Sequence, residues 1–166
     1  YKRQVWACPA HYYTNFTYWT QHCWGVTCVN DMEAMLSYLP ITIGDKEQAL
    51  ADLVRCYEKM MMRSHTNGGY VNLLDECWKM CEKFNVNIVI MYDHVSCKNV
   101  GGLHGLFEDQ ARERGIHLIW IPHDVMDPRT VSRREMREAF SQYMVTVLNE
   151  KPLDPTLLDY EDALSW

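Results

Sequence analysis

The sequence predicts an α/β fold, with a doubly wound and roughly four-stranded parallel sheet flanked by helices. Short apolar runs, three of them rich in β-branched residues, occur at 4–8, 25–29, 88–92 and 116–121. Segments with apolar residues at helical spacing separate these runs, and strands that alternate with helices form parallel sheets covered on both faces. The length of 166 residues and the hydrophobic share of 48% are typical of a domain with a single core.

The first half of the chain is expected to form two strands and two helices. Pro9 ends the first strand, and the aromatic-rich segment from His11 to Trp19 begins as a loop and becomes a helix before the second strand. Asp45 and Gln48 form the D-x-x-Q pattern of a capping box. A long amphipathic helix follows, with apolar residues at helical spacing: Leu50, Leu53, Val54, Tyr57, Met60 and Met61.

After a break at Asn67-Gly68-Gly69, the second half repeats the alternation. One helix carries the stripe Leu73, Leu74, Cys77, Trp78, Cys81 and Phe84 and leads into the strand 88–92. A helix over 103–114 is closed by Gly115, and Pro122 is expected to stop the strand 116–121. Ser132 and Glu135 form a capping box for a helix to about Leu148. Its predicted buried stripe is Met136, Phe140, Met144, Val147 and Leu148. The whole arrangement is of the flavodoxin or Rossmann type.

Residues 1–150 are expected to form a single α/β domain, followed by a tail at 151–166. The tail is too apolar for a free linker, so we expect it to pack on a neighbour or on a partner subunit. The chain begins without Met and opens almost directly on a strand, which indicates a piece of a longer protein. Residues of a shared site can therefore lie outside it.

Composition and motifs exclude several function classes. The net charge of -6 leaves no basic stripe for nucleic acid, and no apolar run approaches the roughly 20 residues of a membrane span. No signal-peptide pattern opens the chain, so a cytoplasmic location is expected. No G-x-G-x-x-G, P-loop or G-x-S-x-G motif is present, which argues against the usual nucleotide-binding and hydrolase classes.

The seven cysteines form an odd set without the close spacing of a disulfide scaffold, which favours reduced thiols. Cys77 and Cys81 share a helical face with Trp78, so core packing is favoured over metal chelation there. Cys8, at the end of the first strand, is the best second thiol by location. No C-x-x-C pair exists, and a self-contained zinc or ferredoxin-type site is therefore not expected.

The most informative segment runs from Ile88 to Lys98, where an apolar strand ends and a polar segment with a thiol begins. Open α/β sheets bind ligands beyond the carboxyl ends of their strands, so Cys97 is the first candidate site residue. The positive charge of Lys98 favours the thiolate that metal ligation requires. Gly101 and Gly102 let the backbone approach a ligand closely. By position alone, a ligand role and an ordinary packed thiol both stay open for Cys97.

Polar residues that follow strands are the other candidates. A parallel sheet would gather four histidines at one edge: His11, His94, His104 and His123. An imidazole there can bind a carbonyl, donate a proton or ligate a metal, although each alone is more often an ordinary loop residue. Asp124, Asp127 and Arg129 either position a ligand or form a rigid turn with an internal ion pair, and the turn is favoured.

Several of these segments occur together in a recognisable order. His94-Val-Ser-Cys-Lys98 precedes a glycine-containing helix, the segment 114–124 follows, and Asp127-Pro-Arg129 leads to the Ser132 helix that bears Phe140. This pattern resembles the 2-hydroxyacyl-CoA dehydratase and benzoyl-CoA reductase family. The resemblance is good over about residues 85–148, and in the rest of the chain it extends only to the arrangement of the elements. In that family an iron-sulfur subunit has two similar α/β domains with a 4Fe-4S cluster between them. The resemblance implies that this chain is the second, C-terminal domain of such a subunit.

The resemblance also implies a chemistry. Cys97 would bind a 4Fe-4S cluster completed by cysteines outside this fragment. A separate ATP-hydrolysing iron-sulfur activator would supply single electrons, which pass to an acyl-CoA thioester for benzoyl-CoA reduction or 2-hydroxyacyl-CoA dehydration. A homologous second subunit would be the partner, with no role for nucleic acid or membrane. The fragment alone is not expected to be active.

The residues expected to contact the acyl-CoA substrate are His11, Tyr12, His94, Lys98 and His104. By the resemblance, the segment from His11 to Trp19 would line the acyl pocket, although simple helix packing explains it equally well. The tail from Pro152 to Trp166 resembles the ring-reductase branch more than the dehydratases. The alternative function is a non-catalytic α/β module that binds a small ligand or serves assembly through its apolar tail.

Overall fold

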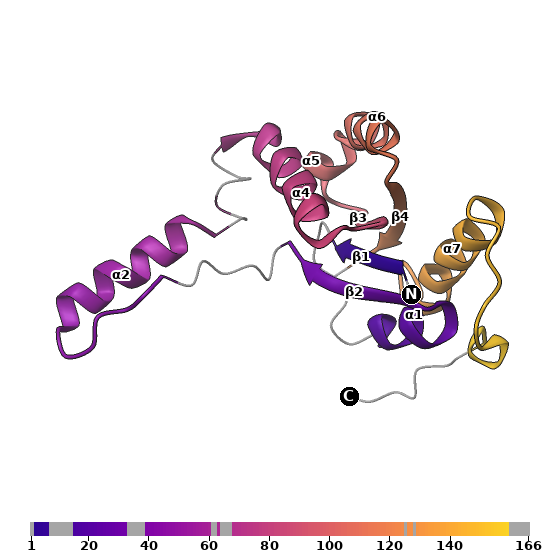
Figure 1. Ribbon diagram of the computed structural model, residues 1–166, viewed down its shortest axis with the longest axis horizontal. Helices are drawn as coiled ribbons and strands as arrows, with labels where there is room; N and C mark the ends of the chain where they lie inside the picture. The colour runs from indigo at the N-terminus through magenta and orange to yellow at the C-terminus, as the bar shows by residue number, and fades with distance from the viewer. Residues whose placement is uncertain are drawn as a thin grey trace.

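The computed structural model describes residues 2–6, 15–32, 39–60, 63, 68–124, 126–127 and 129–159; within these, the side chains of Val5 and Trp6 are not described. Four parallel strands form one sheet (Figure 1), which confirms the predicted fold class. The strands are β1 (Lys2–Trp6), β2 (Val26–Asp31), β3 (Ile88–His94) and β4 (His117–His123). The spatial order is β2-β1-β3-β4.

The strand order contains a reversal of direction between β1 and β3. From β1 the chain crosses through α1 (Phe16–Trp24) to β2 on one side, whereas from β3 it crosses to β4 on the other side. In β1, Gln4 lies opposite Ile88 of β3, and Ile88 in turn lies opposite His117 of β4. The carboxyl ends of β1 and β3 therefore flank the point at which open α/β sheets bind ligands.

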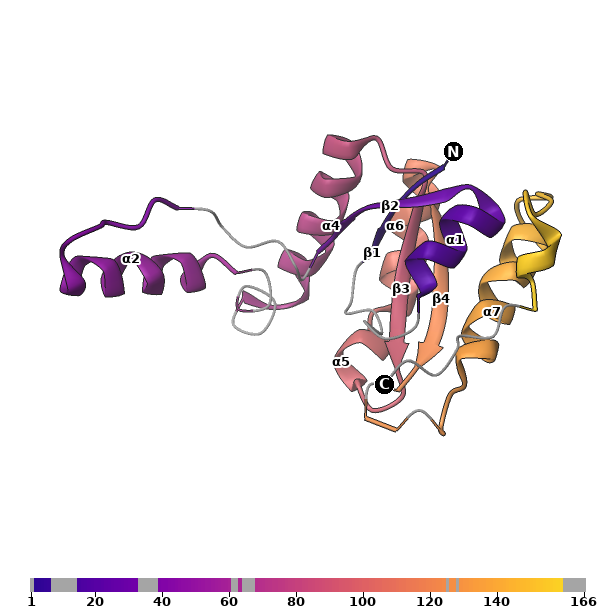
Figure 2. The same cartoon turned by 90° about the horizontal axis from the view of Figure 1, so that it is seen from below.

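Helices cover both faces of the sheet, as Figures 1 and 2 show. One face carries α1 and α7 (Arg133–Thr146), which meet through edge-on contacts between the Phe140 ring and the rings of Phe16 and Trp19. The other face carries α4 (Tyr70–Phe84), α5 (Lys98–Gly101) and α6 (His104–Arg114). The residues of β3 from Ile88 to Tyr92 are all buried, as expected of a strand covered on both faces.

Local signals in the sequence set several helix ends. The Ser132 hydroxyl accepts the Glu135 N–H at 3.1 Å, and the Glu135 carboxylate accepts the Ser132 N–H at 2.6 Å, so the predicted capping box is present. Gly115 ends α6 with a φ of 65°, a left-handed conformation that glycine adopts without steric cost. At α2 (Lys46–Glu58), Asp45 caps the first turn, but the Gln48 side chain donates to Asp52 instead of completing a box.

Pro122 and Val147 do not have the roles that the sequence predicts. Pro122 does not stop β4, which continues to His123. Because β4 is an edge strand of the described sheet and pairs there with β3 alone, a residue without an N–H can lie in it with its nitrogen facing away from the ladder. Val147 does not belong to a buried stripe, since α7 ends at Thr146 and the Val147 side chain is more than half exposed.

The described part of the tail packs on α1 of the same chain. The Leu153 N–H donates to the Cys23 carbonyl at 2.7 Å, and the Trp19 indole N–H donates to the Leu157 carbonyl at 2.8 Å. Leu157 ends a short 3-10 helix, η1 (Pro155–Leu157). These bonds hold residues 153–157 against the amino-terminal half of the fold.

Candidate functional site

A short turn after β3 carries Cys97 at the strand-order reversal. The Cys97 N–H donates to the His94 carbonyl at 2.8 Å, the Ser96 N–H donates to His94 Nδ1 at 3.0 Å, and the Val95 N–H donates to the His123 carbonyl at 3.2 Å. Because Nδ1 accepts a backbone N–H, the neutral His94 ring carries its proton on Nε2. The turn that presents Cys97 is thus held by the His94 ring and by the end of β4.

On the α1 and α7 face of the sheet, two imidazoles and a carboxylate lie together. His94 Nε2 is 3.7 Å from a carboxylate oxygen of Asp124. The buried His123 ring meets the His94 ring edge-on, with 5.3 Å between centroids, and lies 5.4 Å from the Tyr92 ring. The His94 N–H therefore points toward a fixed negative charge, and the cluster can exchange a proton or bind a polar group.

On the opposite face, His104 at the start of α6 packs on the sheet. Its ring stacks on Trp120 with 3.5 Å between centroids and 19° between planes, and its Nε2 lies 3.3 Å from an Asp93 carboxylate oxygen. The partners Asp93 and Trp120 were not predicted. Strand alternation could have separated Asp93 from His94, because adjacent strand residues point to opposite faces.

The other described cysteines are poorer ligands than Cys97. Cys23, Cys77 and Cys81 are buried in the core, as predicted for the α4 pair. Burial raises the pKa of the Cys23 thiol to about 11 and that of the Cys28 thiol to about 12, which opposes the thiolate that a metal requires. Cys97 lies partly buried against the core at the sheet edge.

A family model for the D-component of 2-hydroxyglutaryl-CoA dehydratase matches residues 3–144. The chain belongs to this family. The match confirms the relationship predicted from the Cys97 and Asp127 segments, and it supports a dehydratase-type subunit. No curated protein and no solved structure matches the chain.

The iron-sulfur cluster implied by the resemblance to this dehydratase family can be tested against the donor set. Among the described residues, no group of three or more His, Cys, Asp or Glu side chains is placed to hold a metal ion. Cys97 is a partly buried thiol in a hydrogen-bonded turn at the sheet edge, and no further thiol lies beside it in the described chain. This arrangement is consistent with one ligand to a cluster that other parts of the enzyme complete. It does not fit a complete site.

Of the remaining predicted site residues in this dehydratase-family chain, some lie at the expected sheet edge and others lie outside the described residues. Lys98 is exposed at the first position of α5, next to Cys97. His94 and His104 lie at the predicted edge but on opposite faces of the sheet. His11, Tyr12 and Cys8 lie outside the described residues. No helix of the described chain is long and apolar enough to cross a membrane.

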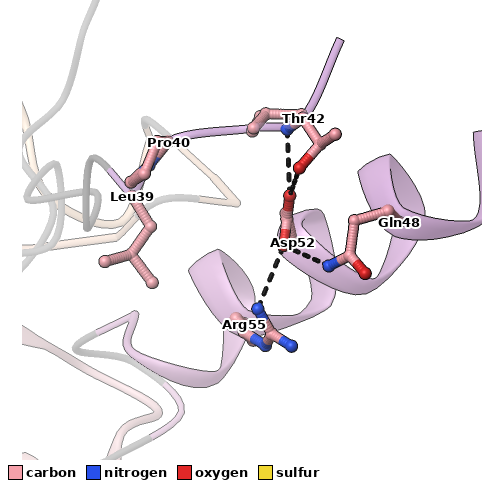
Figure 3. Close-up of a pocket in the computed structure, with 7 residues that line it drawn as sticks. Leu39, Pro40, Thr42, Gln48, Asp52 and Arg55 are labelled. Carbon is pink, nitrogen blue, oxygen red and sulfur yellow. Dashed lines mark hydrogen bonds and ion pairs between the residues drawn. The ribbon is translucent and has the colours of Figure 1, made fainter. Parts of the chain in front are cut away.

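The Asp127 turn has the structural role that was favoured. The Arg129 guanidinium donates to both Asp127 carboxylate oxygens, at 2.9 and 2.8 Å, and lowers the pKa of that carboxyl. Arg129 is exposed and is satisfied by this internal pair. Elsewhere in the described part of the chain, one pocket opens against α2 (Figure 3) and another opens at the amino-terminal end of β4 around His117 and Tyr143.

We expect Asp124→Asn to lower the stability of the fold at neutral pH but not in acid. The N–H groups of Met126 and Asp127 donate to the Asp124 carboxylate at 2.9 and 3.2 Å, and the Met126 bond above all lowers its pKa. A lowered pKa gives stability that is present above the unfolded value of about 3.9 and is lost as pH falls through the folded value. An asparagine side chain can still accept these hydrogen bonds through its amide oxygen, but it carries no negative charge.

Urea unfolding at pH 7 and at stepwise lower pH checks this expectation. The gap between the midpoints of the Asp124→Asn variant and the unsubstituted chain should close below about pH 4. Asp75→Asn, a change on the exposed side of α4, is the control and should follow the unsubstituted chain throughout. A gap that stays constant with pH would show that the carboxylate charge has no role.

Proposed function

We propose that this chain is part of a dehydratase subunit that acts on 2-hydroxyacyl-CoA thioesters and that Cys97 binds a 4Fe-4S cluster shared with the rest of the enzyme. The observation that carries the proposal is the position of Cys97, a partly buried thiol on a hydrogen-bonded turn at the strand-order reversal of a family member. A homologous second subunit and an ATP-hydrolysing iron-sulfur activator are the proposed partners.

A cluster bound at Cys97 would supply single electrons to the thioester. The chain's own residues have other tasks. The turn holds the Cys97 backbone in place, because the Cys97 and Ser96 N–H groups donate to His94 and the Val95 N–H donates to the His123 carbonyl of β4. The imidazoles of His94 and His104, each beside a carboxylate, are placed to hold a proton or a carbonyl oxygen near the same edge.

The test is to measure iron and acid-labile sulfide, with the visible absorption spectrum, of the intact protein purified without oxygen. Stoichiometric iron and sulfide with broad visible absorption are expected. Turnover is then assayed with the activator, ATP and 2-hydroxyacyl-CoA, with benzoyl-CoA as the competing substrate class. A protein without iron would contradict the proposal and favour a non-catalytic α/β binding or assembly module. Reduction of benzoyl-CoA alone would contradict the dehydration but not the cluster.

His94→Ala should loosen the cluster without removing its ligand. The change leaves the Ser96 N–H without the ring nitrogen that accepts it and frees the turn that carries Cys97. Loss of a group that orients a metal ligand commonly costs 10–100-fold in metal retention, so iron should transfer to a chelator about 10–100-fold faster. This rate is measured by anaerobic competition with a chromogenic chelator.

His22→Ala is the matched control, since His22 is an exposed imidazole on α1 that stacks on Tyr18. The rate of iron loss should be unchanged in that variant. Equal rates for His94→Ala and the unsubstituted protein would show that the turn does not depend on the His94 ring.

A further inference from the structure

His94 and His104 both lie at the edge of the sheet that carries Cys97, but their ring nitrogens are engaged differently. In His94, Nδ1 accepts the Ser96 N–H at 3.0 Å, and the hydrogen on Nε2 faces Asp124 across 3.7 Å. To take up a proton, this ring would have to release the Ser96 N–H. The turn that carries Cys97 would then lose one of its hydrogen bonds. The His94 ring is therefore suited to holding the turn and not to accepting a proton from a substrate.

In His104, one ring nitrogen is buried beside a carboxylate. The ring stacks on Trp120 with 3.5 Å between centroids, and its buried Nε2 lies 3.3 Å from a carboxylate oxygen of Asp93. This contact is electrostatic, because Nε2 has no hydrogen-bond acceptor of good geometry in the described chain. An ionised carboxylate has no hydrogen to donate, so it favours the neutral tautomer with the hydrogen on Nε2. The lone pair of that tautomer is on Nδ1.

The second ring nitrogen of His104 is open. Nδ1 makes no hydrogen bond within the described chain and is not buried. The His104 side chain as a whole is 37% exposed, although its Nε2 is buried. An imidazole with one nitrogen oriented by a carboxylate and the other nitrogen open has the arrangement of a general base. Of the two imidazoles, only His104 can take up a proton without breaking a hydrogen bond.

The Cys97 turn leads directly to His104. Cys97 is the N-cap of α5, and its carbonyl accepts the Gly101 N–H at 3.0 Å. The Leu103 N–H donates to the Val100 carbonyl at 2.9 Å, which joins α5 to the residue before His104. Figure 2 shows α5 beside the carboxyl end of β3, on the face that also carries α6. The thiol and the open imidazole therefore belong to one continuous segment at the edge where open α/β sheets bind ligands.

We propose that His104 is the general base of the dehydration and that Asp93 is its positioning residue, an inference that rests on the proposed function. Loss of water from a 2-hydroxyacyl thioester breaks the bond from C2 to oxygen and one bond from C3 to hydrogen. His104 Nδ1 takes the C3 proton, and in the net reaction the electron pair of that bond becomes the second bond between C2 and C3. The hydroxyl leaves with the electron pair of the C2–O bond. The proton then passes to this hydroxide to form water, so no electrons are gained or lost overall.

Replacement of His104 with glutamine tests the base in the intact protein purified without oxygen. A glutamine amide can lie beside Asp93 but has no basic nitrogen. With the activator, ATP and 2-hydroxyacyl-CoA, kcat per bound iron should fall about 10²–10⁴-fold, whereas KM and iron content should stay unchanged. His22→Gln, a change of an exposed imidazole on α1, is the matched control and should keep full kcat. Circular dichroism establishes that both variants are folded.

Diethyl pyrocarbonate gives a readout that does not depend on turnover, because it acylates an imidazole nitrogen whose lone pair is accessible. Peptide mass mapping measures the rate at each histidine. His104 should react faster than His94, and 2-hydroxyacyl-CoA should protect it. Asp93→Asn should slow the reaction at His104, since an asparagine amide can donate to Nε2 and so favour the tautomer with its hydrogen on Nδ1. A mere loss of packing around the ring would instead speed the reaction.

The outcomes distinguish failure of the base from failure of the proposed function. An unsubstituted protein without iron, or without turnover of 2-hydroxyacyl-CoA, would overturn both. Turnover by the unsubstituted protein together with an unchanged kcat per iron in His104→Gln would overturn the base alone and leave the cluster and the dehydration standing. A reaction of diethyl pyrocarbonate at His94 that is as fast as the reaction at His104 would also overturn the base.

Discussion

Replacing Cys97 with serine in the intact protein is expected to remove most of the iron and labile sulfide of the proposed cluster and, with them, the proposed dehydratase activity. A serine hydroxyl is a far poorer iron ligand than a thiolate, and the described chain offers no second thiol at the sheet edge that could replace it. Iron, sulfide and the visible spectrum are measured on protein purified without oxygen. The fold should be retained, because Cys97 lies in a turn rather than inside a strand or helix core.

Two serine variants serve as controls for Cys97→Ser. Cys56 lies on α2, a helix that stands apart from the sheet (Figure 1), and Cys28 has a thiol whose burial raises its pKa to about 12. Cys56→Ser and Cys28→Ser should keep full iron. If the iron content of Cys97→Ser equals that of these controls, Cys97 is not a ligand of the proposed cluster.

The fold could be predicted largely from local signals. Ser132 and Glu135 form the capping box that their spacing indicates, and Gly115 takes the left-handed conformation of a helix terminator. The apolar run from Ile88 to Tyr92 is buried on both faces, as its lack of alternation indicates. These features depend on neighbouring residues, and the sequence contains the physical reasons for them.

Features that depend on distant parts of the chain could not be predicted in this way. Whether Pro122 ends a strand depends on whether that strand has a neighbour on its second side, which the sequence does not state. The spacing of Leu50, Leu53 and Val54 predicted a helix correctly, but spacing alone cannot tell which surface covers it. An apolar stripe is equally consistent with a core and with an interface.

The site residues also divide into positions that a local rule predicts and contacts that depend on distant parts of the chain. The rule that polar residues gather beyond strand ends placed His94, His104 and His123 at one edge of the sheet, and they lie there. The split of these histidines between two faces depends on strand alternation and on how α6 crosses the sheet. The stacking of His104 on Trp120 requires that crossing, which no local pattern determines.

Phe140→Ala is expected to cost about 3–5 kcal/mol of unfolding free energy, the range for truncating a buried phenylalanine. The Phe140 side chain is fully buried and joins α7 to α1 through edge-on contacts. Its ring centroid lies 5.8 Å from that of Phe16, 5.6 Å from Trp19 and 6.4 Å from Trp24. Alanine would leave a cavity among large rings that cannot all move inward. Since whole domains are stable by about 5–15 kcal/mol, this variant should be close to unfolding.

Urea denaturation followed by tryptophan fluorescence measures this loss, because Trp19 and Trp24 lie in the affected cluster. Val145→Ala is the matched control on the same helix, where a half-exposed side chain should change the unfolding free energy by no more than about 0.5 kcal/mol. Phe140→Leu should recover part of the loss by filling some of the cavity. A cost below about 1 kcal/mol for Phe140→Ala would mean that α1 and α7 close over the gap, and that the aromatic cluster does not hold this face of the sheet together.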